Sequence, residues 1–264
     1  MKVKIYSMYD HFRNHKPVDK EPYIPCYNDF HVYDNLEDNA IALLIEPRSI
    51  QPDIYDWMEK NYSKFKLVFT HDSILLSCLP NARLILWGGV WSWSNANIRF
   101  NKTKNISFAC ADKEMCIQHI RRKQLCLDLE KKIDCMGTYN GGSFASTEQI
   151  YRDYRFSVCI ENYRDDLWFS EKICNAFANK CVPIYYGARN IGKLFDLEGI
   201  IQVDNLNDLP KVVDNILYDP VWEYGHRNKA IDYNFQKVKE FENFEEWFFK
   251  RYERELDELY DLCH

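Results

Sequence analysis

Three consecutive residues, Ser170, Glu171 and Lys172, carry side chains that could bind a ligand or take part in catalysis. They come directly before an apolar pattern with helical spacing. Ser is a favoured helix N-cap, and the apolar residues that follow at i, i+3 and i+4 indicate a helix with one buried face. Backbone N–H groups at a helix start attract phosphate, and a Lys there opposes the helix dipole, which indicates an anion nearby. These residues alone leave two interpretations open, a phosphate site and a solvated helix end.

The apolar segment from Phe156 to Ile160 predicts a central strand of a parallel sheet. Glu161 and Asn162 follow directly, at the carboxyl end of that strand. Ligands of open α/β sheets bind beyond the carboxyl ends of the strands. We therefore expect a ligand site between this strand end and the helix that begins at Ser170.

Strands and helices alternate along the chain, and the alternation occurs twice. Apolar runs predict strands at 2–9, 40–47, 66–72, 82–89, 106–111, 133–137, 155–162, 181–187 and 199–205. Helices are expected at 51–65, 114–132, 170–179, 209–217 and 241–262, with a short one near Gln149. Residues 12–29, which contain Pro, are expected to form a loop with short pieces. The repeated alternation predicts an α/β protein with two parallel sheets.

A stretch rich in Gly, Ser and Asn, Gly88–Asn105, interrupts this alternation and indicates a linker or interdomain loop. We place an N-terminal α/β domain at residues 1–95 and a second, C-terminal α/β domain at 96–240. A C-terminal helix at 241–264 follows, for which packing back on the N-terminal domain is one option.

The composition argues against several classes of protein. The net charge is −6 and the only dense basic cluster, Ile120–Gln124, is short, so a nucleic-acid binder is not expected. We see no signal peptide and no apolar stretch long enough to span a membrane, and we expect a cytoplasmic protein whose Cys residues are buried and reduced. The set Cys110, Cys116 and His119 fits no standard zinc spacing, and we predict no metal site.

The stretch from Phe156 to Gly187 resembles the signature of glycosyltransferase family 10, the α-1,3/4-fucosyltransferases. That family carries Phe-Glu-Asn-Ser, then Tyr-x-Thr-Glu-Lys, a helix, and a strand with Val/Ile-Pro-Ile/Val-x-x-Gly. This chain carries Ile-Glu-Asn, then Trp-Phe-Ser-Glu-Lys, then Val-Pro-Ile-Tyr-Tyr-Gly. The similarity extends over Ile106–Asn205 and is weaker before it. Two departures from the family pattern leave the identity of the donor sugar open. Leu167-Trp168 stands in place of the usual Asp-Tyr, and Tyr163–Asp166 stands in place of a Ser-rich turn.

The resemblance implies a GT-B fold, with two Rossmann-like domains whose parallel sheets face each other across a cleft. It also implies a GDP-fucose donor, with residues 96–240 as the nucleotide-sugar-binding domain and residues 1–95 as the acceptor-side domain. Glu171 is expected to hold the ribose hydroxyls, Lys172 the pyrophosphate, and Arg122 or its neighbour Arg121 a second positive charge. The full donor-binding set predicted in this way is Arg121, Arg122, Asn162, Trp168, Ser170, Glu171 and Lys172.

The catalytic base of the family lies at the end of a strand of the N-terminal domain, and Glu46 occupies that place here. The other interpretation of Glu46 is a turn cap or an ion pair with Arg48. Trp91 and Trp93 are candidates for stacking on an acceptor sugar, and a packed interdomain loop is their alternative role.

The predicted function is an inverting glycosyltransferase that moves fucose from GDP-fucose to a glycan hydroxyl. The sequence lacks the Asp-x-Asp motif that holds a metal in many GT-A enzymes, and we predict a metal-independent enzyme without a cofactor. Its partners are a nucleotide-sugar donor and an oligosaccharide or glycoconjugate acceptor, and the chain resembles a bacterial or viral relative, in the cytoplasm of the bacterium or of the host cell. One alternative keeps the fold with another donor, such as a UDP-pentose (xylose) or another GDP-sugar. The second is a non-catalytic glycan- or nucleotide-binding protein.

Overall fold

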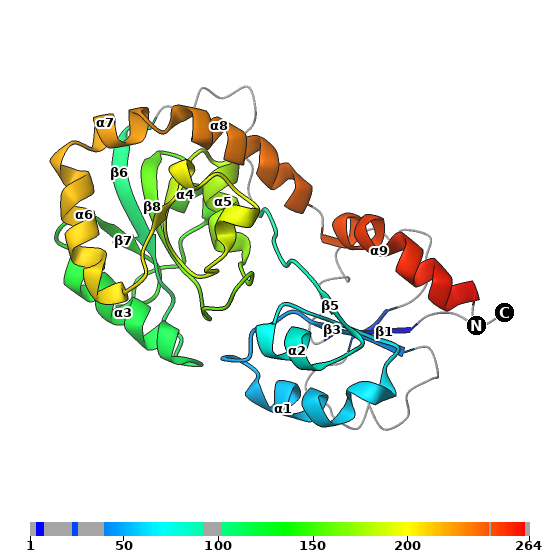
Figure 1. The fold of residues 1–264 in the computed structure, drawn as a ribbon. Helices are drawn as coiled ribbons and strands as arrows, with labels where there is room; N and C mark the ends of the chain where they lie inside the picture. Colours follow the sequence, from blue (N-terminus) through cyan, green and yellow to red (C-terminus); the bar gives the residue numbers. More distant parts are fainter. Residues whose placement is uncertain (1–3, 8–22, 26–39, 92–101, 243, 262–264) are drawn as a thin grey trace. The chain divides into compact units, whose positions relative to one another are not determined.

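The computed structural model describes residues 4–7, 23–25, 40–91, 102–242 and 244–261 of the chain (Figure 1). The chain divides into two compact units. The first unit comprises residues 1–87 together with 244–264, and the second comprises residues 88–243. Each unit holds one five-stranded parallel sheet with helices around it, and the predicted α/β class with two parallel sheets is confirmed.

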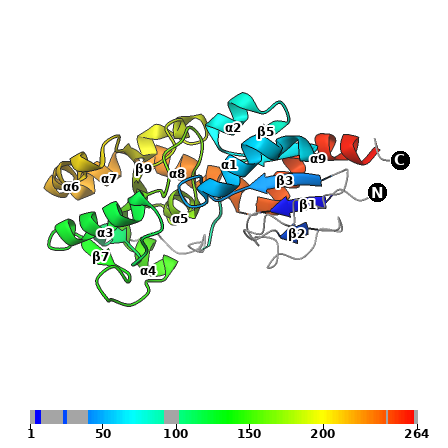
Figure 2. The ribbon, with the colours of Figure 1, turned by 90° about the horizontal axis from the view of Figure 1, so that it is seen from below.

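The sheet of the first unit has the strand order β2-β1-β3-β4-β5. Figure 2 shows β2, β1 and β3 side by side. The strands are β1 Lys4–Ser7, β2 Tyr23–Pro25, β3 Ala40–Leu44, β4 Leu67–Thr70 and β5 Ala82–Leu84. The three residues of β2 lie within 12–29, the segment predicted to be a loop with short pieces. Pro25 is tolerated there because β2 lies at the edge of the sheet, where a residue without an N–H breaks no central ladder.

Helices cover both faces of this first sheet (Figures 1 and 2). Alternate residues of β3 and β4 pack against α1 (Pro52–Asn61) and α2 (Ser73–Cys78). The remaining residues of both strands pack against α9 (Phe244–Asp261), where Phe69 meets the rings of Phe248 and Tyr252 at centroid distances of 4.9 and 4.7 Å. The C-terminal helix is therefore part of the core of the first unit.

The sheet of the second unit has the strand order β10-β9-β8-β6-β7. Its strands are β6 Lys104–Ala109, β7 Asp134–Met136, β8 Tyr154–Ile160, β9 Val182–Tyr186 and β10 Ile201–Gln202. Counted within its own unit, each sheet has the order second-first-third-fourth-fifth, the flavodoxin-like doubly wound arrangement. The two halves of the chain thus share one topology.

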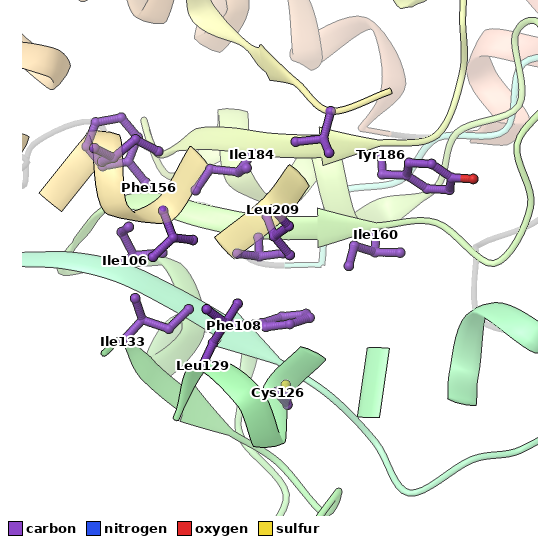
Figure 3. Close-up of a cluster of buried hydrophobic side chains, with 14 of the residues drawn as sticks. Ile106, Phe108, Cys126, Leu129, Ile133, Phe156, Ile160, Ile184, Tyr186 and Leu209 are labelled. Carbon is purple, nitrogen blue, oxygen red and sulfur yellow. The ribbon is translucent and has the colours of Figure 1, made fainter. Parts of the chain in front are cut away.

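The period-2 pattern of the strands divides the second unit into two layers of side chains. Phe156, Val158 and Ile160 of β8 lie in the core that Figure 3 shows, together with residues of α3 (Ile117–Leu129) and α6 (Leu209–Tyr218). Ser107 lies on the opposite face of the sheet, where its hydroxyl donates to Ile150 O of α4 (Thr147–Tyr151) at 2.6 Å. The remaining helices are α5 Glu171–Ala178, α7 Pro220–Gly225 and α8 Asn228–Lys237.

A buried lysine ties together the ends of two of these helices. The ammonium of Lys102 donates to Tyr151 O at 3.0 Å, Arg152 O at 2.9 Å and Asn179 O at 2.6 Å. These carbonyls lie at the carboxyl ends of α4 and α5, where helices leave acceptors without intrahelical partners. Among the helices in the described residues, none has the length and apolar character needed to cross a bilayer.

Candidate functional site

The topology of the second sheet predicts a ligand site at the carboxyl ends of β6 and β8. These neighbouring strands mark the point where the strand order reverses, and doubly wound sheets bind ligands beyond the carboxyl ends of the strands at such a point. Glu161 and Asn162 follow β8, and α5 begins ten residues after Glu161. In the first sheet the equivalent neighbours are β1 and β3, and Glu46 lies two residues beyond β3.

The carboxylate of Glu161 joins the strand end to the helix start. Glu161 is completely buried, and its backbone N–H extends the strand ladder by donating to Tyr186 O at 2.8 Å. Its Oε1 accepts from Ser170 N at 2.9 Å and its Oε2 accepts from Ser170 Oγ at 2.7 Å. Ser170 caps α5, as the sequence predicted, because its Oγ also accepts from Lys172 N at 3.4 Å.

Gly187 makes room for this carboxylate. A Cβ at this position would lie 2.6 Å from Glu161 Cγ and 2.3 Å from Tyr185 Oη. The Tyr185 hydroxyl is fixed in turn, because it accepts from Ala188 N at 3.0 Å. The Gly that ends the Val-Pro-Ile-Tyr-Tyr-Gly segment is therefore required by the close approach of Glu161.

Lys172 lies between two carboxylates. Its Nζ donates to Ser170 Oγ at 3.0 Å and to Glu171 Oε1 at 3.2 Å, and lies 3.4 Å from Glu161 Oε2. The ammonium therefore makes two hydrogen bonds and an additional ion pair with Glu161. Burial lowers the pKa of Lys172, but the nearby charges of Glu171 and Glu161 outweigh it and leave this pKa above its usual value. The helix start therefore carries a permanent cation.

The two acids differ in their protonation. Burial raises the pKa of Glu161, and the Lys172 ammonium offsets this only in part. Burial also acts to raise the pKa of Glu171, but Lys172 and hydrogen bonds to the carboxylate bring it below its usual value. Glu171 is thus firmly anionic, whereas Glu161 is the easier of the two to protonate.

The structure distinguishes between the two arginines that the sequence left open. Arg122 is buried, and its Nη1 donates to Ile160 O, at the very end of β8, at 3.2 Å. Its Nε is buried without a hydrogen-bond partner. Arg121 is exposed on the surface of α3. Of the pair, Arg122 therefore reaches the end of β8.

His119 is a member of this cluster that the sequence did not indicate as a donor-site residue. It is buried, and its Nδ1 accepts from Met115 N at 3.2 Å. Burial, followed by the charges of Arg122 and Lys113, lowers the pKa of His119 to about 4, although a hydrogen bond with Asn162 opposes this. His119 is therefore a neutral imidazole at pH 7, with its proton on Nε2. Among the residues that the structure describes, no group of three or more His, Cys, Asp or Glu side chains is arranged to hold a metal ion.

The predicted aromatic contacts have different surroundings. Trp168 is only 3% exposed, so protein encloses the ring that was expected to line the donor site. Trp91 is 69% exposed, and its backbone N–H donates to Asn175 Oδ1 at 2.8 Å. Trp93 lies outside the described residues.

The charged turn between strand and helix is built from internal contacts. Arg164 lies over the ring of Tyr186 at 5.1 Å, donates to Asp204 O at 2.8 Å and pairs with the Asp204 carboxylate. Asp165 is buried, and its carbonyl accepts from Arg189 N at 2.9 Å. These contacts hold the turn against the segments that follow β9 and β10, so its charges have a structural role.

Glu46 is half-buried in the first unit, in the bend that follows β3. Its backbone carbonyl accepts from the Tyr55 hydroxyl at 2.5 Å. Arg48, the partner considered from the sequence, pairs with Asp72 at 3.0 Å and Glu59 at 2.9 Å, and also with Asp56.

Residues 100–219 match the family described as glycosyltransferase family 10 (fucosyltransferase), C-terminal part. The resemblance to glycosyltransferase family 10 is confirmed. The matched residues run from before β6 to just beyond α6 and contain every predicted donor-binding residue. The match lies entirely within the second unit, which comprises residues 88–243.

A curated relative supports the same family. The alpha-(1,3)-fucosyltransferase FucT of Helicobacter pylori is 25% identical to this chain over 92 residues. Those residues make up 35% of this chain and 18% of the relative, so the similarity spans less than a fifth of that protein.

Solved structures are similar in fold to most of the chain. An alpha1,3-fucosyltransferase structure is similar over 89% of this chain and 80% of its own, with a TM-score of 0.56 and 14% identity. An alpha1,3-fucosyltransferase structure with GDP has a TM-score of 0.52 and 13% identity over 90% of this chain and 82% of that one. A mutant of TarM from S. aureus, in a complex that includes UDP, has a TM-score of 0.54 and 12% identity over 83% of this chain and 51% of that one. The fold is therefore of the GT-B type.

Proposed function

We propose that this chain is a glycosyltransferase that moves fucose from GDP-fucose to a hydroxyl of a glycan acceptor, with inversion at the anomeric carbon. One observation carries the proposal: the ammonium of Lys172, held by two carboxylates at the start of α5, lies within the residues that match family 10. Helix starts and fixed cations stabilise the charge of a departing diphosphate.

The residues of the second unit take donor-binding roles in this proposal. Lys172, the backbone N–H groups of α5 and the Arg122 guanidinium face the diphosphate. The anionic Glu171 accepts from the ribose hydroxyls, and Asn162 and Ser170 complete the donor site. The low exposure of Trp168 favours a supporting role for its ring, beneath the residues that contact the donor.

The first unit supplies the base in this proposal. Glu46 accepts the proton of the acceptor hydroxyl as its oxygen forms a bond to the anomeric carbon. The bond from that carbon to the diphosphate oxygen breaks at the same time, and the diphosphate leaves with the electron pair. Base catalysis of this kind contributes roughly 10²–10⁴ in rate. Direct displacement by the acceptor accounts for inversion.

We also propose that the transfer needs no metal ion, because the cations of Lys172 and Arg122 can stabilise the charge of the departing diphosphate. The corresponding measurement is transfer activity before and after treatment with EDTA. Unchanged activity agrees with the proposal. Activity that is lost with EDTA and recovered on addition of Mn²⁺ or Mg²⁺ would show that a metal ion, and not the cationic side chains, stabilises the leaving group.

The test of the function is a labelled-sugar transfer assay combined with nucleotide binding by calorimetry. We expect GDP to bind and UDP not to bind, and Arg122→Ala to weaken GDP binding by about tenfold or more. Arg121→Ala is the matched control, since Arg121 is the exposed neighbour, and it should bind GDP as the wild type does. Binding of UDP alone would favour a UDP-pentose donor. Tight GDP binding without transfer to any glycan would favour a non-catalytic binding protein.

A further inference from the structure

Glu161 is the one carboxylate of the cluster that solvent cannot reach, since it is 0% exposed. A side chain enclosed in this way does not itself touch a donor. The hydrogen bonds and the ion pair of its carboxylate go to Ser170 and Lys172, two residues that the proposed function places in the donor site. Glu161 can therefore influence the donor only through these two residues.

The hydroxyl of Ser170 shows how this influence works. It has a single proton, which goes to Glu161 Oε2 at 2.7 Å, and two acceptor positions. These accept from Lys172 N at 3.4 Å and from Lys172 Nζ at 3.0 Å. Because the carboxylate takes the proton, the lone pairs of Ser170 are turned toward Lys172.

The three partners of the Lys172 ammonium are not equivalent. Ser170 and Glu171 accept hydrogen bonds from it, and Glu161 Oε2 lies 3.4 Å away as an ion-pair partner, so a diphosphate competes with these oxygens for the ammonium. The side chain of Glu171 is 20% exposed and is the one expected to turn toward the ribose, whereas Glu161 is locked by two contacts with Ser170. Once Glu171 has turned, Ser170 and Glu161 still hold the ammonium, and the proton that Glu171 accepted is available to the diphosphate.

We propose that Glu161 is a positioning residue for the diphosphate, which keeps Lys172 in place while Glu171 exchanges the lysine for the ribose of the donor. This inference rests on the proposed function, because it assigns the diphosphate of a nucleotide sugar to Lys172. It makes Glu161 necessary for one part of the ligand only. A carboxylate that merely joins β8 to α5 would affect all parts of the ligand alike.

The substitution Glu161→Gln separates these two roles. Gln keeps the size of Glu and an oxygen for Ser170 N, but its amide NH₂ donates to Ser170 Oγ and carries no charge for Lys172. The measurements are dissociation constants for GDP, GMP, UDP and UMP. The diphosphate is compared with the monophosphate of the base, guanine or uracil, that the wild type binds. We expect the affinity for the diphosphate to fall about tenfold or more, and that for the monophosphate to change less than about threefold.

A double-mutant cycle with Lys172→Ala tests whether Glu161 acts through the lysine. We expect Glu161→Gln to cause no further loss of diphosphate affinity when Lys172 is already Ala, because coupled residues are not additive. Glu198→Gln, an exposed carboxylate of the same unit, is the matched control and should leave both affinities unchanged. Ser170→Ala, which removes the bridging hydroxyl, is a second variant and should show the same preference for loss at the diphosphate.

Several results would overturn the inference. Equal losses for monophosphate and diphosphate, additive losses with Lys172→Ala, or unfolding of both Glu161→Gln and Ser170→Ala would leave Glu161 with a purely structural role. An unchanged diphosphate affinity in Glu161→Gln would remove the role while the proposed function stands. A wild-type protein that binds none of the four nucleotides would instead remove the proposed function, and the inference with it.

Discussion

Replacing Lys172 with Met should destabilise the second unit even without a ligand. The substitution leaves the Glu161 carboxylate completely buried and without its cation. At the 3.4 Å separation of Nζ and Oε2, the attraction between the two charges is about 5 kcal/mol at an effective dielectric constant near 20. Removing one partner of a buried pair costs roughly 3–5 kcal/mol. Ser170 still donates two hydrogen bonds to Glu161, and Lys172 is partly exposed, so we expect about 2–3 kcal/mol at pH 8.

The pH dependence has a definite sign. Burial already raises the pKa of Glu161, and loss of the Lys172 charge raises it further. A protonated Glu161 leaves no buried charge, so the cost of Lys172→Met should be largest above the folded-state pKa of Glu161 and shrink as the pH falls toward 5. The assay is urea unfolding at pH 8 and pH 5, with hydrogen exchange of peptides from β8 and α5 to locate the effect.

Two variants serve as controls for this prediction. Lys211→Met, on the exposed surface of α6, should change the free energy of unfolding by less than about 0.5 kcal/mol. The double variant Glu161→Gln with Lys172→Met should recover part of the loss, since no buried charge remains. A cost below about 0.5 kcal/mol at pH 8, or the same cost at both pH values, would refute the electrostatic account of this cluster.

Three further predictions concern the stability of the fold. Phe248→Ala should cost about 3–5 kcal/mol in thermal unfolding of the first unit, because this ring is fully buried against Phe69; a small loss would show that α9 does not belong to that core. Lys102→Met should leave three carbonyls without their donor and speed hydrogen exchange at the carboxyl ends of α4 and α5, and unchanged exchange would contradict this. The pKa of His119 is lowered to about 4 in the folded protein, so on acidification this side chain is protonated in the unfolded chain first, and the free energy of unfolding should fall as the pH drops from about 6.5 toward 4. His119→Gln should make this pH dependence less steep, and an equally steep profile would exclude His119 as its source.

The elements with strong local signals were predictable from the sequence. The apolar runs around β8 and β9 identify their strands, and Ser170 marks the start of α5 within one residue. Three helices, α2, α7 and α8, were not predicted. In α8 the buried residues Ala230, Ile231, Asn234 and Phe235 have helical spacing, but an Asn among them obscures the apolar face.

The choice between Arg121 and Arg122 was within reach of the sequence. The buried residues His119, Arg122, Cys126 and Leu129 recur along α3 at spacings of three or four, so they share one face of the helix. Cys126 and Leu129 identify that face as the one toward the sheet. The same spacing excludes Arg121, which lies on the surface. Polar residues on an apolar face are thus a usable signal for a site at the end of the sheet.

The role of Glu161 was not within reach of the sequence. Its partner Ser170 lies nine positions along the chain, across a turn whose path depends on contacts with distant residues. Arg164 binds Asp204, forty positions away, and Asp165 binds the backbone of Arg189. No local pattern encodes such contacts. The only hint is chemical: a Glu directly after a buried strand is costly to enclose without partners, so partners must be found elsewhere.

The charges of the cluster bear on the kind of ligand it suits. Glu161 and Glu171 balance Lys172 and Arg122, so the four side chains have no net charge while both acids are ionised. An isolated phosphate gains little from a neutral cluster. A ligand that also offers ribose hydroxyls draws Glu171 away from Lys172, and the positive charge is then directed at its phosphates. On the proposed function, we therefore expect a nucleoside diphosphate to bind much more tightly than inorganic pyrophosphate, because the sugar hydroxyls and the phosphates act on the same lysine.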